Sequence, residues 1–297
     1  MGKKIYIILF ISICLTACGN SGNQLTTKET VTNKKIEMTY YEDQLTEREL
    51  KAYEKIIERA EQISTEDIIL EEGISDYELI RLTEAINIDR PDLFYIYEIE
   101  EIKLGGAINP YDNDLIDMCK KSEKTNKIKI EYIWDSKEEI EEAISQLDEK
   151  VKEITQKVII GENIISAEKY LKNQLQAITE IDTEFIKKHS KRNAKETDKK
   201  EFLSMKAYGA LVEEKASCGG FTSAYNLLLN EVGIESTGLQ VLLSNQVHIC
   251  NIVKINDKYV VVDLLNFMKP VFNKQFSELN YNAGKYELYS LFEHNLE

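Results

Sequence analysis

The feature that most constrains the fold of this chain is one helix pattern followed by three closely spaced strand patterns near the C-terminus. Residues 221–232 place apolar side chains at helical spacing, and Gly233 follows where a helix typically ends. Three apolar runs then predict strands, at residues 234–243, 248–255 and 258–265. Asn256-Asp257, between the last two runs, is typical of a tight hairpin turn. We therefore predict an α+β fold, with helices packed on an antiparallel sheet.

Upstream, the chain shows the patterns of a second, smaller α+β region. Thr46 with Glu49, and Ser75 with Glu78, match capping boxes ahead of apolar residues at helical spacing. Further patterns predict strands at 94–104 and 128–134, a long helix after Ser136, and helices at 164–181 and 202–212. We expect a signal peptide at 1–17, a flexible Asn/Thr/Ser/Gly/Lys-rich tether at 18–43, an α+β N-terminal domain at 44–160 and a C-terminal domain at 161–297.

The first residues predict export and attachment to a membrane. Two lysines precede an apolar stretch at residues 5–15, which is too short to span a bilayer. The sequence Leu-Thr-Ala then stands directly before Cys18 and resembles a bacterial lipobox. This resemblance implies that Cys18 becomes the lipid-modified first residue of the mature protein, held on the extracytoplasmic face of the bacterial cell membrane. The alternative is an ordinary signal peptide with an incidental cysteine.

The charge balance argues against nucleic acid as a partner. The formal net charge is −15, whereas binding to phosphates requires clustered Lys and Arg. The negative net charge also argues against binding to anionic lipid through a cluster of basic residues. The lysine-rich segment 187–200 is a local exception, but Glu196 and Asp198 interrupt it and it holds no aromatic residue. We interpret this segment as a solvated loop.

The cysteine count does not indicate a disulfide framework. Of the five cysteines, Cys14 is expected to leave with the signal peptide and Cys18 to carry lipid. The three that remain are Cys119, Cys218 and Cys250, and an odd number outside the cytoplasm leaves at least one free thiol. A bridge between Cys119 and Cys250 stays open at this point.

Three residues of the C-terminal unit have settings that suit a thiol nucleophile. Cys218 precedes the predicted helix, where unpaired N–H groups and the helix dipole favour the thiolate form. His248 opens one predicted strand and Asp263 closes the next, so the two side chains can share a sheet face. His248 would take the thiol proton and Asp263 would orient the imidazole. Taken singly, each has a structural interpretation: a core cysteine, a strand histidine and a strand-ending aspartate.

Other parts of such a site are less defined. The backbone N–H of Cys218 is a natural oxyanion donor, and Tyr208 or Gln246 is a candidate for a second. Gly219 and Gly220 would allow close approach of a substrate backbone. This chemistry needs no cofactor. A metal site is not expected, because the chain has three histidines and no paired Cys-x-x-Cys.

The C-terminal segment resembles the bacterial transglutaminase-like domains of the papain-like superfamily. The residues that carry this resemblance are Ala207–Phe221, Ala224–Leu229, Gly233-Ile234, His248 with Asn251–Val253, Lys258-Tyr259 and Val262-Asp263. It implies a cysteine-bearing helix packed on an antiparallel sheet that carries the histidine and aspartate, and it covers roughly residues 200–267. Cys250 stands where relatives usually carry tryptophan, and the stretch after Asp263 lacks their usual threonine and tryptophan.

The resemblance implies a cysteine-dependent hydrolase or acyltransferase that acts on an amide in a protein or a cell-wall peptide. We expect protease-like hydrolysis, in line with relatives of this type. One alternative is a non-catalytic binding lipoprotein on the same fold. Another is a cross-linking transglutaminase that joins glutamine side chains to amines.

Overall fold

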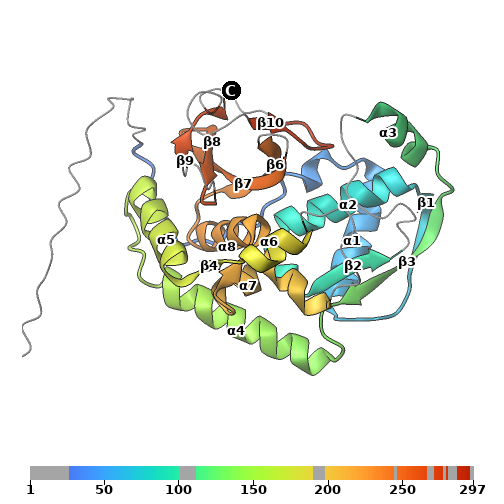
Figure 1. Cartoon of the computed structure of the whole chain (residues 1–297), viewed down its shortest axis with the longest axis horizontal. Coiled ribbons are helices and arrows are strands. Elements are labelled where there is room, and N and C mark those ends of the chain that lie inside the picture. The colour runs from blue at the N-terminus through green and yellow to red at the C-terminus, as the bar shows by residue number, and fades with distance from the viewer. Residues whose placement is uncertain are drawn as a thin grey trace, which may run out of the picture.

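The chain folds into an α+β architecture of antiparallel sheets and packed helices, as the sequence predicted. The computed structural model describes residues 27–100, 112–189, 198–243, 246–265, 271–276, 279 and 286–294. The predicted signal peptide and Cys18 lie outside these residues. Figure 1 shows a five-stranded sheet above a central helix, α8, with α7 and α4 beneath that helix and a three-stranded sheet to one side.

The N-terminal region builds the three-stranded sheet and the helices around it. Its elements are the 3₁₀ helix Glu42–Gln44, α1 (Glu47–Glu61), β1 (Ile68–Ile74), α2 (Asp76–Asp89), the 3₁₀ helix Pro91–Leu93, β2 (Ile96–Glu100), α3 (Asn113–Lys120), β3 (Thr125–Tyr132) and α4 (Lys137–Thr155). The sheet order is β1-β3-β2 and both pairings are antiparallel. The capping boxes predicted at Thr46 and Ser75 are both present, because each side chain accepts a hydrogen bond from its N3 amide.

The C-terminal region supplies the helices and sheet that hold the candidate site. Its elements are α5 (Ile164–Ile178), β4 (Glu180–Ile181), α6 (Thr183–His189), η3, a 3₁₀ helix (Lys199–Met205), α7 (Ala207–Leu211), β5 (Lys215–Ala216), α8 (Cys218–Glu231), β6 (Ser236–Leu243), β7 (Gln246–Ile255), β8 (Lys258–Asp263), β9 (Val271–Lys274) and β10 (Tyr286–Leu288). The large sheet has the order β10-β6-β7-β8-β9 and is antiparallel throughout, whereas β4 and β5 form a short parallel pair.

Local sequence explains the turns of this region. Asn256 and Asp257 both adopt positive φ, 54° and 59°, as a two-residue hairpin turn of the predicted kind requires. Gly233 has φ 83° directly after α8, which is the left-handed position where glycine ends a helix. Both predicted turns are therefore confirmed.

Several predicted segments differ from the structure. The helix predicted at 164–181 ends at Ile178, and Glu180–Ile181 form strand β4 instead. The loop predicted at 187–200 begins later, because residues 187–189 are the end of α6. The helix predicted at 202–212 is divided into η3 and α7, because Lys206 between them has extended backbone angles.

The tether predicted at 18–43 is not a tether over residues 27–43. There Val31 is buried and its N–H donates to the Glu162 carbonyl at 2.8 Å, and the Tyr41 hydroxyl donates to the Gly238 carbonyl at 2.7 Å. These contacts fasten the segment along the C-terminal region.

The large sheet is buried on both faces. The face towards α8 joins the main core, which also contains apolar residues of α1, α2 and β3, so buried side chains from both predicted domains form one cluster. The proposed boundary at residue 160 stays a prediction. The opposite face carries a smaller cluster: Leu239, Val241, Cys250, Ile252, Val261, Leu279 and Tyr286. Alternation along each strand separates the two sets, as expected for pleated strands.

Candidate functional site

The candidate nucleophile lies at the first residue of the central helix. Cys218 begins α8, directly after the N-cap Ser217, and its side chain is only partly buried. The backbone N–H groups of Gly219 and Ile249 lower the pKa of its thiol. Unpaired N–H groups and the positive end of the helix dipole favour a negative charge at this position. The structure therefore gives Cys218 a setting that stabilises a thiolate.

The histidine and the aspartate are in direct contact. His248 lies on β7 and Asp263 at the end of the adjacent β8, and His248 Nε2 is 2.9 Å from Asp263 Oδ2. Both side chains are buried, with 9% and 1% of their surface exposed. Because Nε2 faces the carboxylate, Nδ1 is the ring nitrogen that remains to interact with Cys218, and each of these two residues shifts the pKa of the other. The structure thus brings Cys218, His248 and Asp263 together.

The electrostatics favour charge separation between thiol and imidazole. Burial would raise the pKa of Cys218, but the hydrogen bond and charge of His248 and the two backbone N–H groups outweigh it and lower that pKa below its usual value. Burial would lower the pKa of His248, but hydrogen bonds to Asp263 and Cys218 and their charges raise it well above its usual value. Both shifts favour a thiolate beside an imidazolium over a neutral thiol beside a neutral imidazole.

A residue that the sequence analysis missed also contacts the aspartate. The Tyr286 hydroxyl donates to Asp263 Oδ2 at 2.6 Å, and the Leu265 N–H donates to Oδ1 at 3.1 Å. Tyr286 lies on β10, and β6 and β7 separate that strand from β8. In a flat sheet this separation would be about 14 Å. The contact therefore requires the sheet to curl around this face. No local sequence pattern predicts that curvature.

The two glycines after the nucleophile serve the protein's own packing. A Cβ on Gly219 would lie 3.1 Å from the Met205 carbonyl oxygen, and one on Gly220 would lie 2.5 Å from that of Ser204. The sequence analysis expected these glycines to admit a substrate backbone. In the structure they let η3 lie directly against the start of α8, so the close approach is between two segments of this chain.

A polar network fixes α8 to the strand that carries the histidine. Asn251 on β7 donates to the Thr222 carbonyl at 2.9 Å and to Asn226 Oδ1 at 2.7 Å. Asn226 Oδ1 also accepts from the Ser236 hydroxyl at 2.6 Å. These groups are buried, so a shift of α8 along β7 would leave some of them without a hydrogen bond, at a cost in free energy. The network therefore holds the helix in register with β7. This register sets the position of Cys218 relative to His248.

The two candidates for an additional oxyanion donor occupy different surroundings. The Tyr208 hydroxyl donates to Gln146 Oε1 of α4 at 2.6 Å, and its ring stacks on Phe94 at 5.1 Å between centroids. That hydroxyl is therefore engaged with α4. Gln246 is exposed at the start of β7, two residues before His248. Its role as a donor stays a prediction.

The remaining cysteines of the described residues are unpaired with each other. Cys119 on α3 and Cys250 on β7 are both buried free thiols. The Cys250 thiol lies 3.8 Å from the Leu239 carbonyl, and burial raises its pKa well above the usual value. Cys250 therefore packs as a small neutral residue in the same buried cluster as Leu239, Val241 and Ile252.

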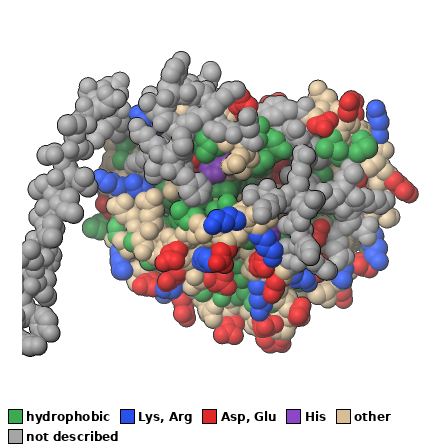
Figure 2. All heavy atoms as spheres, in the orientation of Figure 1, with side chains coloured by type: hydrophobic (Ala, Val, Ile, Leu, Met, Phe, Trp, Pro, Cys, Tyr) green, Lys and Arg blue, Asp and Glu red, His purple; other side chains and the backbone are tan. Residues whose placement is uncertain are grey.

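Two exposed apolar side chains lie next to Cys218 and His248. Met205, whose backbone lies against Gly219, is 43% exposed, and Val247, next to His248, is 58% exposed. Figure 2 shows one histidine with hydrophobic side chains beside it, and acidic and basic side chains along the lower edge of the view. Met205 and Val247 give the surface next to Cys218 and His248 two exposed apolar side chains.

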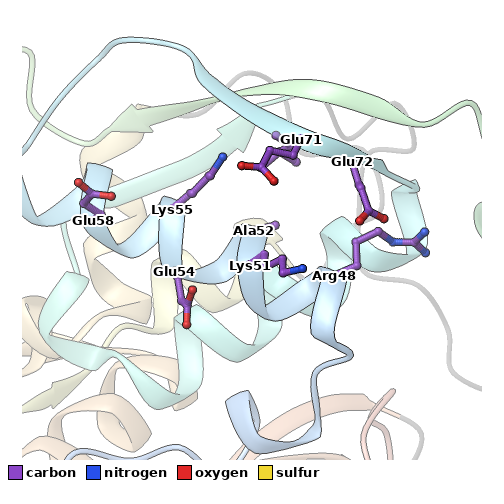
Figure 3. A pocket seen from close by; sticks show the side chains of 9 residues that line it. Arg48, Lys51, Ala52, Glu54, Lys55, Glu58, Glu71 and Glu72 are labelled. Carbon is purple, nitrogen blue, oxygen red and sulfur yellow. The ribbon is translucent and has the colours of Figure 1, made fainter.

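A cavity among the described residues lies away from Cys218, His248 and Asp263. Figure 3 shows a cavity of about 310 Å³ between α1 and β1, where Lys51, Lys55 and Arg48 face acidic residues that include Glu71 and Glu72. Its mixed charge favours no single class of ligand. The described residues contain no cluster of three or more His, Cys, Asp or Glu side chains suited to a metal. Within the same residues, no helix is long and apolar enough to span a membrane.

Comparison with solved structures gives distant likeness to one group of folds. A structure described as a TGase shares 17% identity over 51% of this chain, with a TM-score of 0.35. A candidate cysteine protease from Cytophaga hutchinsonii shares 14% identity over 40%, with a TM-score of 0.29. A candidate protease from Parabacteroides distasonis shares 12% over 54%, with a TM-score of 0.26. The matches cover only 39%, 37% and 31% of those chains. No family model and no curated protein matches the sequence.

Proposed function

We propose that this protein is a thiol-dependent enzyme that cleaves or transfers the acyl group of an amide, with hydrolysis as its main reaction. The observation that carries the proposal is the convergence of Cys218 at the start of a helix with the buried pair His248 and Asp263. A structural cysteine needs neither a lowered pKa nor a histidine oriented by a carboxylate. Both are requirements of nucleophilic catalysis.

The geometry supports a two-step reaction. The Cys218 thiolate adds to the amide carbonyl, and the N–H groups at the start of α8 stabilise the oxyanion that forms. The His248 imidazolium then gives its proton to the leaving amine, the C–N bond breaks and a thioester remains on Cys218. In the second step His248 takes a proton from the acceptor, which displaces the thiolate. Asp263 accepts the imidazole N–H and orients the ring throughout.

The acceptor decides whether the enzyme is a hydrolase or a transferase. Because water is far more concentrated than any amine, hydrolysis is expected unless the protein binds an amine beside the thioester. The exposed Met205 and Val247 favour peptides with an apolar residue near the reactive amide. Proteins and cell-wall peptides both offer such amides.

The proposed reaction can be tested with the full mature protein. It is incubated with peptides that carry apolar residues next to glutamine or to a backbone amide, together with a biotin-labelled primary amine. Mass spectrometry should detect free acid products in excess over biotin adducts, and neither product with Cys218→Ser. Predominant biotin incorporation would instead support cross-linking. If wild type and Cys218→Ser give the same products, the proposal fails.

We further propose that the enzyme is attached to the extracytoplasmic face of the membrane through lipid on Cys18. The lipobox-like sequence before this cysteine supports the assignment. Radiolabelled palmitate should enter the wild-type protein in bacterial cells and be absent from Cys18→Ala, because the acyl chains require this sulfur and the new N-terminus. Cys14→Ala is the matched control and should keep the label. Equal labelling of Cys18→Ala would overturn the assignment.

A further inference from the structure

We propose that Tyr286 is a positioning residue. Its hydroxyl holds the Asp263 carboxylate in place and weakens the attraction of that carboxylate for the His248 imidazole. The inference rests on the proposed function, because it concerns the same triad. It assigns to β10 a role that the sequence did not indicate. The Tyr286 hydroxyl donates to the Asp263 carboxylate, which in turn holds His248, so the proposed effect on the thiol passes through Asp263.

The contact geometry carries the inference. The Tyr286 hydroxyl lies 2.6 Å from Asp263 Oδ2, and the same oxygen lies 2.9 Å from His248 Nε2. Tyr286 and Asp263 are 2% and 1% exposed, so water does not compete for this oxygen. The carboxylate thus has two side-chain donors on one atom, and the Leu265 N–H holds its other oxygen. Such a set of bonds fixes the rotation of the carboxylate.

Strand register places Tyr286 on the same face of the sheet as His248. Tyr286 pairs with Leu243 and Leu288 pairs with Val241, while Val241 pairs with His248 on the next strand. Residues paired across strands share a sheet face, and so do residues two apart along one strand. Tyr286 and His248 therefore lie on the same concave face, and the curl of the sheet brings the phenol to Asp263.

A hydrogen bond shared in this way changes the strength of the aspartate as an acceptor. The hydroxyl proton of Tyr286 places positive charge beside Oδ2, which makes the potential at His248 less negative. If the hydroxyl is removed, the carboxylate attracts the imidazolium more strongly and the pKa of His248 rises. A phenol that is a stronger acid donates more strongly and should have the opposite effect.

Few other ionisable groups face this pair within the described residues. Cys218 approaches His248 from α8, and Asp263 approaches it from β8. Cys250 on β7 also interacts with Asp263, but burial keeps its thiol neutral by raising its pKa. Tyr286 is the group that β10 contributes. We therefore expect a substitution of Tyr286 to act mainly by changing the pKa of His248.

The test uses the pH dependence of Cys218 alkylation by iodoacetate in the full mature protein, followed on the Cys218 peptide by mass spectrometry. The rate should rise as the thiolate forms and fall as the imidazolium, which attracts the anionic reagent, loses its proton. The part of this pH profile where the rate falls is its alkaline limb, and Tyr286→Phe should move that limb to higher pH by about 0.5–1 unit. Tyr41→Phe, which removes another buried hydroxyl with a hydrogen bond of 2.7 Å to Gly238, should leave it in place.

The outcomes separate this inference from the proposed function. If the wild-type thiol ionises only at its ordinary pKa, the proposed function fails. If the wild type shows both limbs and Tyr286→Phe leaves the alkaline limb unchanged, the positioning role is overturned, even where the variant is less stable. Site-specific 3,5-difluorotyrosine at residue 286 gives a second test that keeps the hydroxyl. It should move the alkaline limb to lower pH, and an unchanged limb would also overturn the inference.

Discussion

Replacing Cys218 by alanine should lower the rate of amide cleavage by about 10⁴-fold or more while the protein stays folded. The expected loss is large because the variant has no atom that can form the thioester. The start of α8 keeps its oxyanion donors, but these contribute only to the small residual rate. The rate is measured as release of free acid from the peptides that the wild type cleaves best, with folding checked by circular dichroism.

Cys218→Ser provides the matched comparison for this prediction. It keeps the size of the side chain and a hydrogen-bonding atom, but an alcohol is far harder to ionise than a thiol. It should therefore be nearly as inactive as the alanine variant. Retention of more than about a tenth of the wild-type rate in either folded variant would contradict a role for Cys218 as the nucleophile.

The second large effect concerns the thiol itself. His248→Ala should slow alkylation of Cys218 by neutral iodoacetamide about 10- to 30-fold at neutral pH, because an unassisted thiol is only a few per cent ionised there. The expected pH dependence of alkylation follows from the pKa shifts of Cys218 and His248. In the wild type, the ion pair is lost as pH falls through the lowered pKa of Cys218, and also as pH rises through the raised pKa of His248.

A control histidine makes this result specific. His189 on α6 is hydrogen-bonded to the Phe185 carbonyl and stacked on the ring of that residue. His189→Ala should leave the alkylation rate of Cys218 unchanged. Equal rates in the wild type and His248→Ala would mean that the imidazole does not activate the thiol.

Local sequence chemistry predicted much of the site. Cysteine at the start of a helix, and His248 and Asp263 on consecutive strands, follow from apolar patterning and from the turn at Asn256-Asp257. The alternation of a strand then places the histidine and the aspartate on one face. Each of these features depends on residues close in the sequence.

Features that depend on curvature or packing between distant segments were not predictable in this way. Tyr286 reaches Asp263 only because the sheet curls, and Gly219 and Gly220 face η3 because two helical segments converge. Residues 27–43 have a composition typical of a tether, yet buried contacts of Val31 and Tyr41 hold the segment in place. The composition of this segment predicts flexibility, but composition does not show the contacts that the rest of the folded chain offers.

The most direct test of the central claim is the ultraviolet absorbance of the thiolate, recorded across pH as the difference between the wild type and Cys218→Ser. This measurement needs no substrate and reports the ionisation of one sulfur. The account predicts that the signal persists well below pH of about 8.5, where an ordinary thiol is protonated, and that His248→Ala abolishes it there. A signal that appears only at or above that pH in the wild type would contradict the account.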